Sequence, residues 1–219
     1  SMKKMLCCLV LAAFAHLPLS AQKRRAEAPK PEFRFAYFGD YLARPGVKLG
    51  VSYPLAQKIK EKTKPLNREE TYVLTKTRRI ELGGSFTFFH HPKDHNGLLF
   101  NAELTWHRIK NRSYKTRYRH FEAGLGLGYF RYQLLGTTFE PDGEGSFKEK
   151  NNGGGNAFMP SLFAAWGMNL RFIKSADVRA YVKPLIMVEI PYSAGVKTHF
   201  AFEAGLASTL TKNKKSRKK

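Results

Sequence analysis

The sequence predicts an all-β fold, a closed antiparallel transmembrane β-barrel of about eight strands, with ten strands as the alternative count. Three observations predict it: two-faced segments of strand length, glycine-rich second faces, and a start typical of exported proteins. The clearest two-faced segment runs from Leu98 to Trp106. Its even-numbered residues are apolar, and its odd-numbered residues include Asn101, Glu103 and Thr105. Because side chains alternate across a strand, the two sets face opposite sides of a sheet.

Glycine on the second face favours a membrane barrel over a soluble β-domain. In the segment 121–129 the apolar residues alternate with Glu122, Gly124, Gly126 and Gly128. Glycine weakens a strand and gains nothing on a solvent face, whereas the narrow lumen of a small barrel needs small residues. We therefore expect the apolar set to face lipid and the small and polar set to fill the lumen. A soluble calycin-like barrel or β-sandwich, with the apolar set inside, is the alternative.

The start of the chain predicts export. Ser1 precedes Met2, and we interpret it as a residue added in cloning. Lys3 and Lys4, the apolar run 6–15 and the small residues before Gln22 have the order of a signal peptide, which we expect to span residues 1–21. The apolar run is about half the ~20 residues that a membrane-spanning helix needs. Cys7 and Cys8 lie within this segment, so the mature chain would contain no disulfide, catalytic thiol or cysteine-bound zinc.

The strong positive charge has a different meaning in an exported protein. The formal net charge is +21, and it falls to +19 once Lys3 and Lys4 are removed. The basic residues are spread over turns and the C-terminal tail and do not form an interleaved basic and aromatic face, so we predict no nucleic-acid partner. Anionic lipid headgroups and the phosphates of lipopolysaccharide are the expected partners.

The chain divides into a disordered lead-in over 22–31, one barrel domain over 32–211 and a basic tail over 212–219. Alternating apolar residues predict the first two strands at 33–37 and 47–53, separated by the turn signals Gly39-Asp40 and Pro45-Gly46. A basic polar connection, 54–70, follows. The third strand, 80–88, alternates apolar residues with Glu81, Gly83 and Thr87, and the fourth is 98–106 after the Asn96-Gly97 turn.

The second half follows the same rhythm. The fifth strand begins near Arg119 and extends through Tyr132 toward Phe139, and the Gly- and Asn-rich stretch 140–156 is the longest loop. Apolar alternation then predicts strands at 161–171 and 179–189 and a last strand ending near 210. Pro184 is a difficulty for the seventh strand, because proline cannot donate a ladder hydrogen bond. With the C-terminus in the periplasm, the loops at 39–45, 90–97, 140–156 and 191–195 lie outside the cell, and 54–70 lies inside.

The second faces of the strands predict a network of ion pairs in the lumen. Carboxylates and basic side chains share these inward faces, and unpaired charges there would be costly. The predicted members are Glu81, Glu103, Glu122, Glu189, Glu203, Lys48, Arg79, Arg171, Arg179 and Lys183. His120 and His199 are expected to join them through hydrogen bonds. Trp106, Tyr129, Trp166 and Tyr192 lie near strand ends, as an aromatic girdle would.

Candidate sites for chemistry are sparse. His90, His91, Asp94 and His95 are the densest set of metal-binding residue types, and imidazole and carboxylate suit zinc, copper or nickel. Pro92 and Asn96-Gly97 account for the same segment as a polar turn, which is the interpretation we favour. No metal, cofactor or catalytic group is therefore predicted.

Two phrases, His91-Pro92-x-x-His95-x-Gly97-Leu98 and Phe200-Ala201-Phe202-Glu203-Ala204-Gly205-Leu206, resemble small outer-membrane β-barrel proteins of the Bacteroidetes. The resemblance covers most of the mature chain. It implies insertion in the outer membrane and possible outer-membrane protein partners. Such barrels commonly end on an aromatic residue, whereas this chain ends Lys218-Lys219, with Phe200 and Phe202 as internal candidates for that role.

The predicted function is a non-enzymatic outer-membrane barrel with a structural or interaction role, for example as an accessory subunit of a larger envelope complex. The alternatives are a lipid-binding or lipid-modifying outer-membrane enzyme and a soluble exported barrel that binds a small ligand. Lipid A 3-O-deacylases carry a His-x-Ser step followed by a glutamate. Here His199-Phe200-Ala201 precedes Glu203, so alanine stands where the nucleophilic serine would be.

Overall fold

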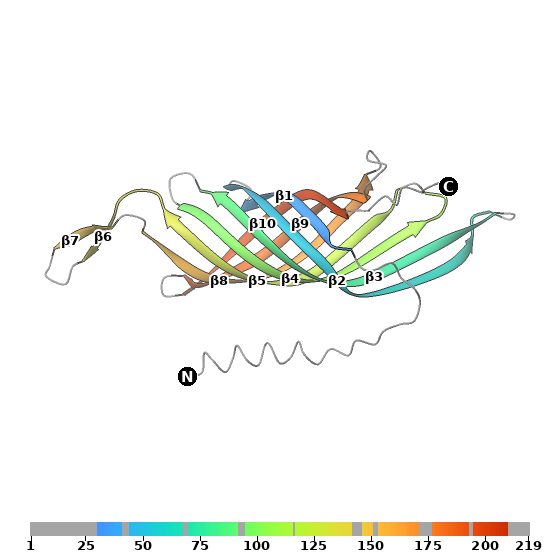
Figure 1. Ribbon diagram of the computed structural model, residues 1–219, viewed down its shortest axis with the longest axis horizontal. Helices are drawn as coiled ribbons and strands as arrows, with labels where there is room; N and C mark the ends of the chain where they lie inside the picture. Colours follow the sequence, from blue (N-terminus) through green and yellow to red (C-terminus); the bar gives the residue numbers. More distant parts are fainter. Residues whose placement is uncertain are drawn as a thin grey trace, which may run out of the picture.

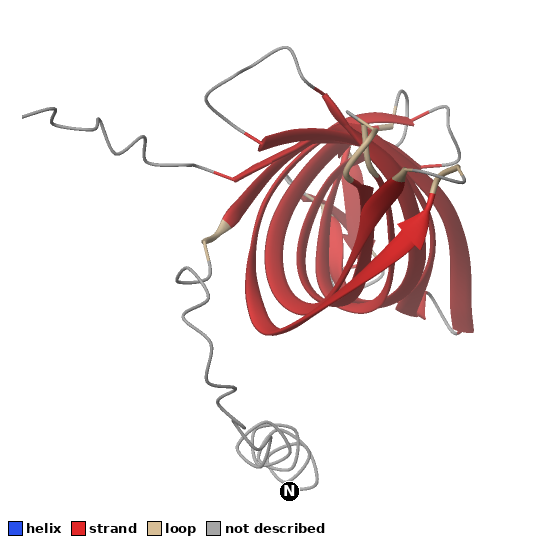
Figure 2. Cartoon of the chain, turned by 90° about the vertical axis from the view of Figure 1, so that its right-hand side faces the viewer, coloured by secondary structure: helices blue, strands red, loops and turns tan. Residues whose placement is uncertain are grey.

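A computed structural model describes residues 30–40, 44–67, 70–91, 95–115, 117–141, 146–150, 153–170, 177–192 and 195–209. Eight antiparallel strands close into a barrel in the order β1-β10-β9-β8-β5-β4-β3-β2, and β6 and β7 form a separate two-stranded sheet (Figures 1 and 2). The predicted all-β barrel of about eight strands is confirmed. The strands are β1 (Glu32–Asp40), β2 (Arg44–Pro65), β3 (Thr71–His90), β4 (His95–Arg112), β5 (Arg119–Leu134), β6 (Thr138–Pro141), β7 (Phe147–Lys150), β8 (Gly154–Leu170), β9 (Asp177–Tyr192) and β10 (Gly195–Thr209).

The barrel closes by pairing its first strand with its last. Glu32 lies opposite Thr209 on β10 and opposite Ser52 on β2, so both ends of the barrel domain lie at one end of the cylinder, which we call the terminal end. The β6–β7 hairpin follows β5 and projects from the opposite end, which we call the loop end (Figure 1).

The two faces of each strand differ as the sequence pattern predicts. Outward apolar side chains are about half exposed, as at Leu125 (59%), Leu162 (57%) and Phe200 (57%). Inward charged side chains are buried, as at Lys183 and Glu203, each 1% exposed. Charge inside and apolar surface outside is the inverse of a water-soluble domain. Within the described residues no helix is long and apolar enough to span a membrane.

The predicted polar connection 54–70 is wrong. β2 continues to Pro65 and β3 begins at Thr71, so most of this segment forms a long hairpin that projects past the other strands (Figure 1). Lysine is rare in strands, which is why the segment suggested a loop. The ladder nevertheless continues as far as Pro65 opposite Thr71, after a bulge between Pro54 and Ala56.

Other loops are shorter than predicted. β4 begins at His95, which removes part of the predicted loop 90–97. β5 ends at Leu134, and the predicted continuation toward Phe139 is the separate strand β6. β7 and the first residues of β8 occupy part of the predicted loop 140–156. The predicted signal peptide, nearly all of the lead-in and the basic tail lie outside the described residues.

The prolines inside β8 and β9 are accommodated by gaps in one ladder. Pro184 keeps its register opposite Phe202 on β10. Toward β8, the pairing passes from Phe163–Leu185 directly to Trp166–Val182. The same ladder passes from Phe158–Ile190 to Ser161–Met187 around Pro160. A proline that lacks a donor is tolerated where the ladder is already interrupted.

Candidate functional site in the barrel lumen

A four-membered ring of alternating charge crosses the middle of the lumen. We call Lys48, Glu103, Lys183 and Glu203 the lumen ring. Lys48 Nζ lies 2.7 Å from Glu103 and 2.6 Å from Glu203, and Lys183 Nζ lies 2.7 Å from Glu103 and 3.5 Å from Glu203. The four side chains come from β2, β4, β9 and β10. Each ammonium contacts both carboxylates, so the ring has no net charge and joins opposite walls.

A second network fills the terminal end of the lumen, around Arg34 of β1. The Arg34 guanidinium makes a two-pronged contact with Glu122, at 2.7 and 3.3 Å, and lies 3.1 Å from Glu32 and 3.5 Å from Glu81. Arg179 contacts Glu32 from β9. Planar, forked arginine–carboxylate contacts are among the strongest ionic hydrogen bonds in proteins. This network therefore ties β1 to β3, β5 and β9.

His107 connects members of this network through both of its ring nitrogens. Its Nε2 lies 3.1 Å from Arg179 Nη1, and its Nδ1 lies 3.2 Å from Glu81. Arginine only donates, so Nε2 must accept, and the ring proton belongs on Nδ1, from which it is donated to Glu81. Ser52 also donates to Glu81, at 3.2 Å.

His107, His120 and Glu122 bring ligand atoms within 4.8 Å of one another, which is a geometry that could hold a metal ion. The surrounding charges oppose this. His107 Nε2 is occupied by Arg179 and Glu122 by Arg34, so a divalent cation would lie against two guanidinium groups. The geometry therefore favours an ion-pair and hydrogen-bond network over a metal centre.

Near the loop end, His199 lies between two carboxylates. Its Nδ1 is 3.3 Å from both oxygens of Asp40, and its Nε2 is 3.0 Å from Glu189. A serine hydrolase would need a hydroxyl on one of these nitrogens. Both nitrogens face carboxylates instead, and Ala201 follows on the same inward face. His199 therefore joins β10 to β1 and β9.

An apolar cluster closes the remaining lumen toward the loop end. Phe89 and Phe130 stack with ring centroids 5.6 Å apart, and Phe38 lies 5.6 Å from Phe89. Lys183 Nζ lies 3.8 Å above the ring of Phe163, which links this cluster to the lumen ring. The cavity beside the lumen ring has a volume of about 20 Å³, the space of about one water molecule.

This filling predicts that the barrel does not conduct ions. Purified protein in a planar bilayer should give no steady conductance above the bare membrane, because the lumen ring and the aromatic cluster leave no continuous path. Single-channel recording checks this, with a known porin as the positive control. Reproducible open-channel steps that are seen with the protein and are absent in a control with detergent alone would contradict the closed lumen.

The structure places nine of the ten residues predicted for the lumen network. Glu81, Glu103, Glu122, Glu189, Glu203, Lys48, Arg179 and Lys183 are buried inside the barrel. Arg79 is less buried, with Nη1 4.0 Å from Glu81. Arg171 lies outside the described residues. Of the histidines expected to join them, His199 hydrogen-bonds as described, and His120 Nε2 lies 3.7 Å from Glu122.

Sequence reasoning missed Arg34, Glu32 and Asp40, which all lie on the inward face of β1. Phe33, Phe35 and Tyr37 alternate with these residues on the opposite face of the strand. Period-two alternation alone would have found the three residues.

Of the four residues considered as metal ligands, His90, His91, Asp94 and His95, the three described histidines make separate contacts. His90 Nδ1 lies 2.7 Å from Asn96 Oδ1, and the rings of His91 and His95 stack with centroids 5.5 Å apart. Asp94 lies outside the described residues.

At the base of the β6–β7 hairpin, Arg131, Tyr132, Gln133, Gly154, Gly155 and Asn156 line a polar hollow of about 340 Å³.

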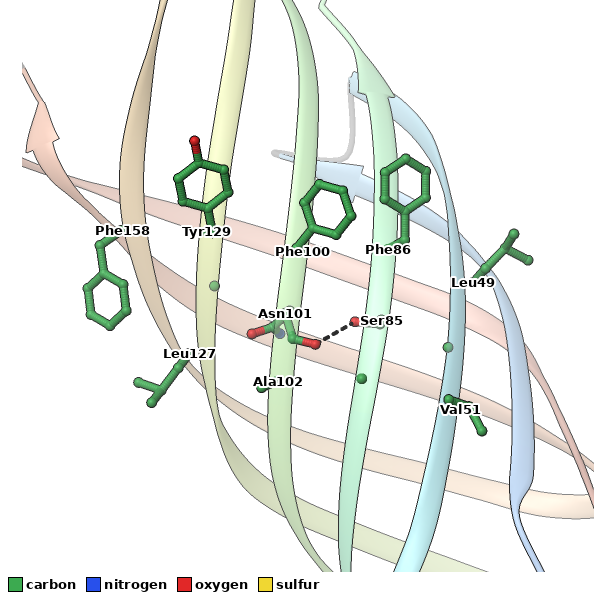
Figure 3. A pocket seen from close by; sticks show the side chains of 13 residues that line it. Leu49, Val51, Ser85, Phe86, Phe100, Asn101, Ala102, Leu127, Tyr129 and Phe158 are labelled. Atoms are coloured by element: carbon green, nitrogen blue, oxygen red, sulfur yellow. Dashed lines mark hydrogen bonds between the residues drawn. The ribbon is translucent and has the colours of Figure 1, made fainter. Parts of the chain in front are cut away.

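A larger hollow, of about 740 Å³, lies on the outer wall of the barrel. Gly84 of β3 and Ala102 of β4 lie opposite each other at its centre, where their small side chains leave a depression in the outer surface. Leu49, Val51, Phe86, Phe100, Leu127, Tyr129 and Phe158 surround it (Figure 3). Ser85 and Asn101 are its polar lining residues, and they are joined by a 3.5 Å hydrogen bond from the Ser85 hydroxyl to the Asn101 carbonyl (Figure 3).

No protein-family model matches this sequence, and no curated protein does either. Among solved structures, the chain is similar to the outer membrane enzyme PagL, with a TM-score of 0.43, 11% identity, and coverage of 82% of this chain and 99% of that chain. It is similar to Neisserial surface protein A with a TM-score of 0.43, 11% identity, and coverage of 83% and 94%. It is similar to the N-terminal β-barrel domain of Pseudomonas aeruginosa OprF with a TM-score of 0.38, 14% identity, and coverage of 83% and 97%.

Proposed function

We propose that this protein is an outer-membrane β-barrel with a structural or interaction role, and not a channel or an enzyme. The observation that carries the proposal is the inverted distribution of polarity in a closed barrel. Charged side chains fill the middle and the terminal end of the lumen, an apolar cluster fills the rest, and large apolar side chains cover the wall. In water such a wall would be a large exposed apolar surface, whereas in a bilayer it contacts the apolar lipid chains.

The closed lumen supports the non-enzymatic part of the proposal. Of the described lumen residues, His107 and His199 hydrogen-bond to carboxylates, and Ser52 hydrogen-bonds to Glu81 and not to a histidine. The cavity beside the lumen ring, of about 20 Å³, is too small for a small-molecule ligand, which counts against a soluble ligand-binding barrel.

The first test is membrane fractionation followed by gel mobility with and without boiling. We expect the protein in the outer-membrane fraction and a mobility shift on boiling, because a closed barrel held by the lumen network resists detergent. Recovery in the soluble periplasmic fraction with no shift would contradict the proposal.

Recognition is assigned to the loop end, because loops on a rigid scaffold are free to carry binding residues. The β6–β7 hairpin projects there (Figure 1), above the polar hollow at Arg131 and Asn156. Lipopolysaccharide or a second outer-membrane protein is the proposed partner, and membership of a larger envelope complex follows from the latter. Pull-down in mild detergent with and without residues 138–150 tests this, and unchanged co-purifying material would contradict it.

A lipid-binding role is the second candidate, favoured by the hollow on the outer wall. Its apolar lining and its place midway along β3 and β4 suit an acyl chain. Its lining residues include no acid, base or histidine, so it would bind lipid without modifying it. Identical lipid A acylation in cells with and without the protein would agree with this and would remove a deacylase function.

Photo-cross-linking distinguishes a lipid from a protein in this hollow. A photoreactive amino acid at Ala102 should yield adducts of lipid mass, whereas the same group at Leu206, on the exposed wall of β10, should yield fewer. Mass spectrometry of the intact barrel reads the result. Protein-sized adducts at Ala102 would assign the hollow to a partner subunit, and equal lipid yields at both positions would remove it as a site.

A further inference from the structure

Three strands, β2, β3 and β4, continue past the apolar wall at the terminal end, and together with the first residue of β5 they carry a dense set of positive charges on one face. The residues of this cationic array are Lys58, Lys60, Lys62, Lys64, Lys76, Arg78, Arg108, Lys110, Arg112 and Arg119. On β3 and β4 they have the same parity as the outward Ile80 and Trp106, so the array continues the outer face of the barrel.

The ladder registers arrange these residues in rows. Arg78 lies directly opposite Lys58 on one side and Arg108 on the other. In the next row, Lys60, Lys76, Lys110 and Arg119 follow one another across β2, β3, β4 and β5. Directly opposite side chains have their Cβ atoms about 5 Å apart, and like charges in such positions destabilise a sheet.

No acid on this face offsets the repulsion. The positions that β2, β3 and β4 present on this face between the bulge and their described ends include no aspartate or glutamate. Glu61 lies on the opposite face, paired with Thr75. Partial desolvation and repulsion from Arg108, Lys62, Lys110 and Lys64 lower the pKa of Lys76. An anionic counterpart outside the chain would relieve this repulsion.

Protection of a free sheet edge accounts for only part of the array. Among the described residues, the edge of β2 that faces away from β3 has no strand partner beyond the bulge, and lysines there discourage pairing with other chains. That reason applies to Lys58, Lys60, Lys62 and Lys64. It does not apply to β3 and β4, which are paired on both sides where they carry Arg78, Arg108 and Lys110.

The first row of the array lies at the height of the lipid headgroups. On β3 the apolar wall runs from Phe88 to Ile80, which spans about 21 Å along the membrane normal for a strand tilted by about 40°. The row of Arg78 lies about 5 Å further and the row of Lys76 about 10 Å further. The polar layer begins where the apolar wall ends and is about 5–7 Å thick, so it contains the row of Arg78, and the long side chains of the row of Lys76 extend back to it. Trp106 and Phe121 mark that end, with ring centroids 6.1 Å apart.

We propose that the cationic array binds the phosphate groups of anionic phospholipids in the leaflet at the terminal end and gathers these lipids on one side of the barrel. The inference rests on the proposed function, because it requires the barrel to lie in a membrane. The array is one-sided among the described residues: the outward positions nearest the terminal end on the other strands are Leu170 on β8, Val178 on β9, Ser208 on β10 and Phe33 on β1, none of which is charged. Bound lipid is therefore concentrated beside β2–β5.

The two tryptophans of the chain permit a direct test. In a Trp166→Phe background Trp106 is the only tryptophan whose fluorescence is measured. It lies on β4 two residues from Arg108, on the side of the apolar wall. The barrel is reconstituted in phosphatidylcholine vesicles, and quenching by lipids with brominated chains gives the association of phosphatidylglycerol relative to phosphatidylcholine. We expect a preference of about threefold or more for phosphatidylglycerol at low salt, which decreases as salt screens the charges.

A quadruple variant should reduce this preference to a ratio of about one. Its substitutions are Lys76→Gln, Arg78→Gln, Arg108→Gln and Lys110→Gln. The matched control, Lys214→Gln, Lys215→Gln, Arg217→Gln and Lys218→Gln, removes the same charge from the tail and should leave the preference unchanged. An equal loss in both variants would show that net charge, and not the array, attracts the lipid.

Equal association of the two lipids with the unaltered array would overturn the proposal. Polyglutamate that binds the array in phosphatidylcholine vesicles without any preference for phosphatidylglycerol would overturn it in favour of an acidic protein partner. Failure of the proposed function is seen separately. A barrel that does not float with vesicles and shows no heat-induced mobility shift fails before any lipid is compared.

Discussion

Replacing Glu103 by glutamine should destabilise the folded barrel by about 3 kcal/mol or more, the largest effect we expect from a single charge in the lumen. Glu103 accepts from Lys48 and Lys183, each at 2.7 Å, and from Asn101 at 3.0 Å. Both lysines are buried, so removal of this carboxylate leaves two ammonium groups with only Glu203 as their shared counter-charge. Urea unfolding in phospholipid vesicles, followed by tryptophan fluorescence, measures the loss.

Two further variants make the result specific to the lumen ring. Glu61→Gln removes the same charge from an exposed position of the β2–β3 hairpin and should change the stability by less than about 0.5 kcal/mol. The double variant Glu103→Gln, Lys48→Met leaves Lys183 paired with Glu203 and should recover part of the lost stability. A Glu103→Gln barrel as stable as the unaltered protein would show that water screens the ring.

Gly124→Ala should be strongly damaging although it adds a single methyl group, costing about 1–3 kcal/mol or preventing folding. A Cβ atom at this position would lie 2.4 Å from the Leu104 carbonyl oxygen and 2.6 Å from Cζ of Phe163. The first contact is with backbone of the neighbouring strand, which cannot move without breaking the ladder. The yield of refolded, heat-modifiable barrel and its urea midpoint together measure the effect, so a variant that fails to fold still gives a result.

Gly84→Ala is the matched control, because it makes the same change on the outer wall. No atom lies within 4 Å of a Cβ built at Gly84, so alanine there only begins to fill the hollow. We expect stability at or slightly above that of the unaltered barrel, because alanine is less flexible than glycine in the unfolded chain. Equal losses at both positions would mean that glycine is needed for strand flexibility and not for room in the lumen.

These glycines also show how far the sequence could be interpreted. Gly124, Gly126 and Gly128 alternate with apolar residues, and this pattern predicted which face is inward. The close approaches at Gly124 and Gly126 show why the lumen requires it. By contrast, the sequence did not predict the long β2–β3 hairpin, because alternating lysines are typical of solvated loops. The β2 strand of this hairpin is held by its pairing with β3, and β3 is held in turn by its pairing with β4. Local propensity does not report such pairings.

Alternation in the chain alone therefore determined the fold class, the inward and outward faces and most members of the lumen network. The tertiary structure decided which charges meet. Lys48 pairs with Glu203, 155 residues away, and Arg34 with Glu122, 88 residues away. Alternation has a period of two residues and selects a face, but it does not set the height at which a side chain crosses the lumen. That height depends on the tilt and stagger of all eight strands, which exist only once the barrel has closed.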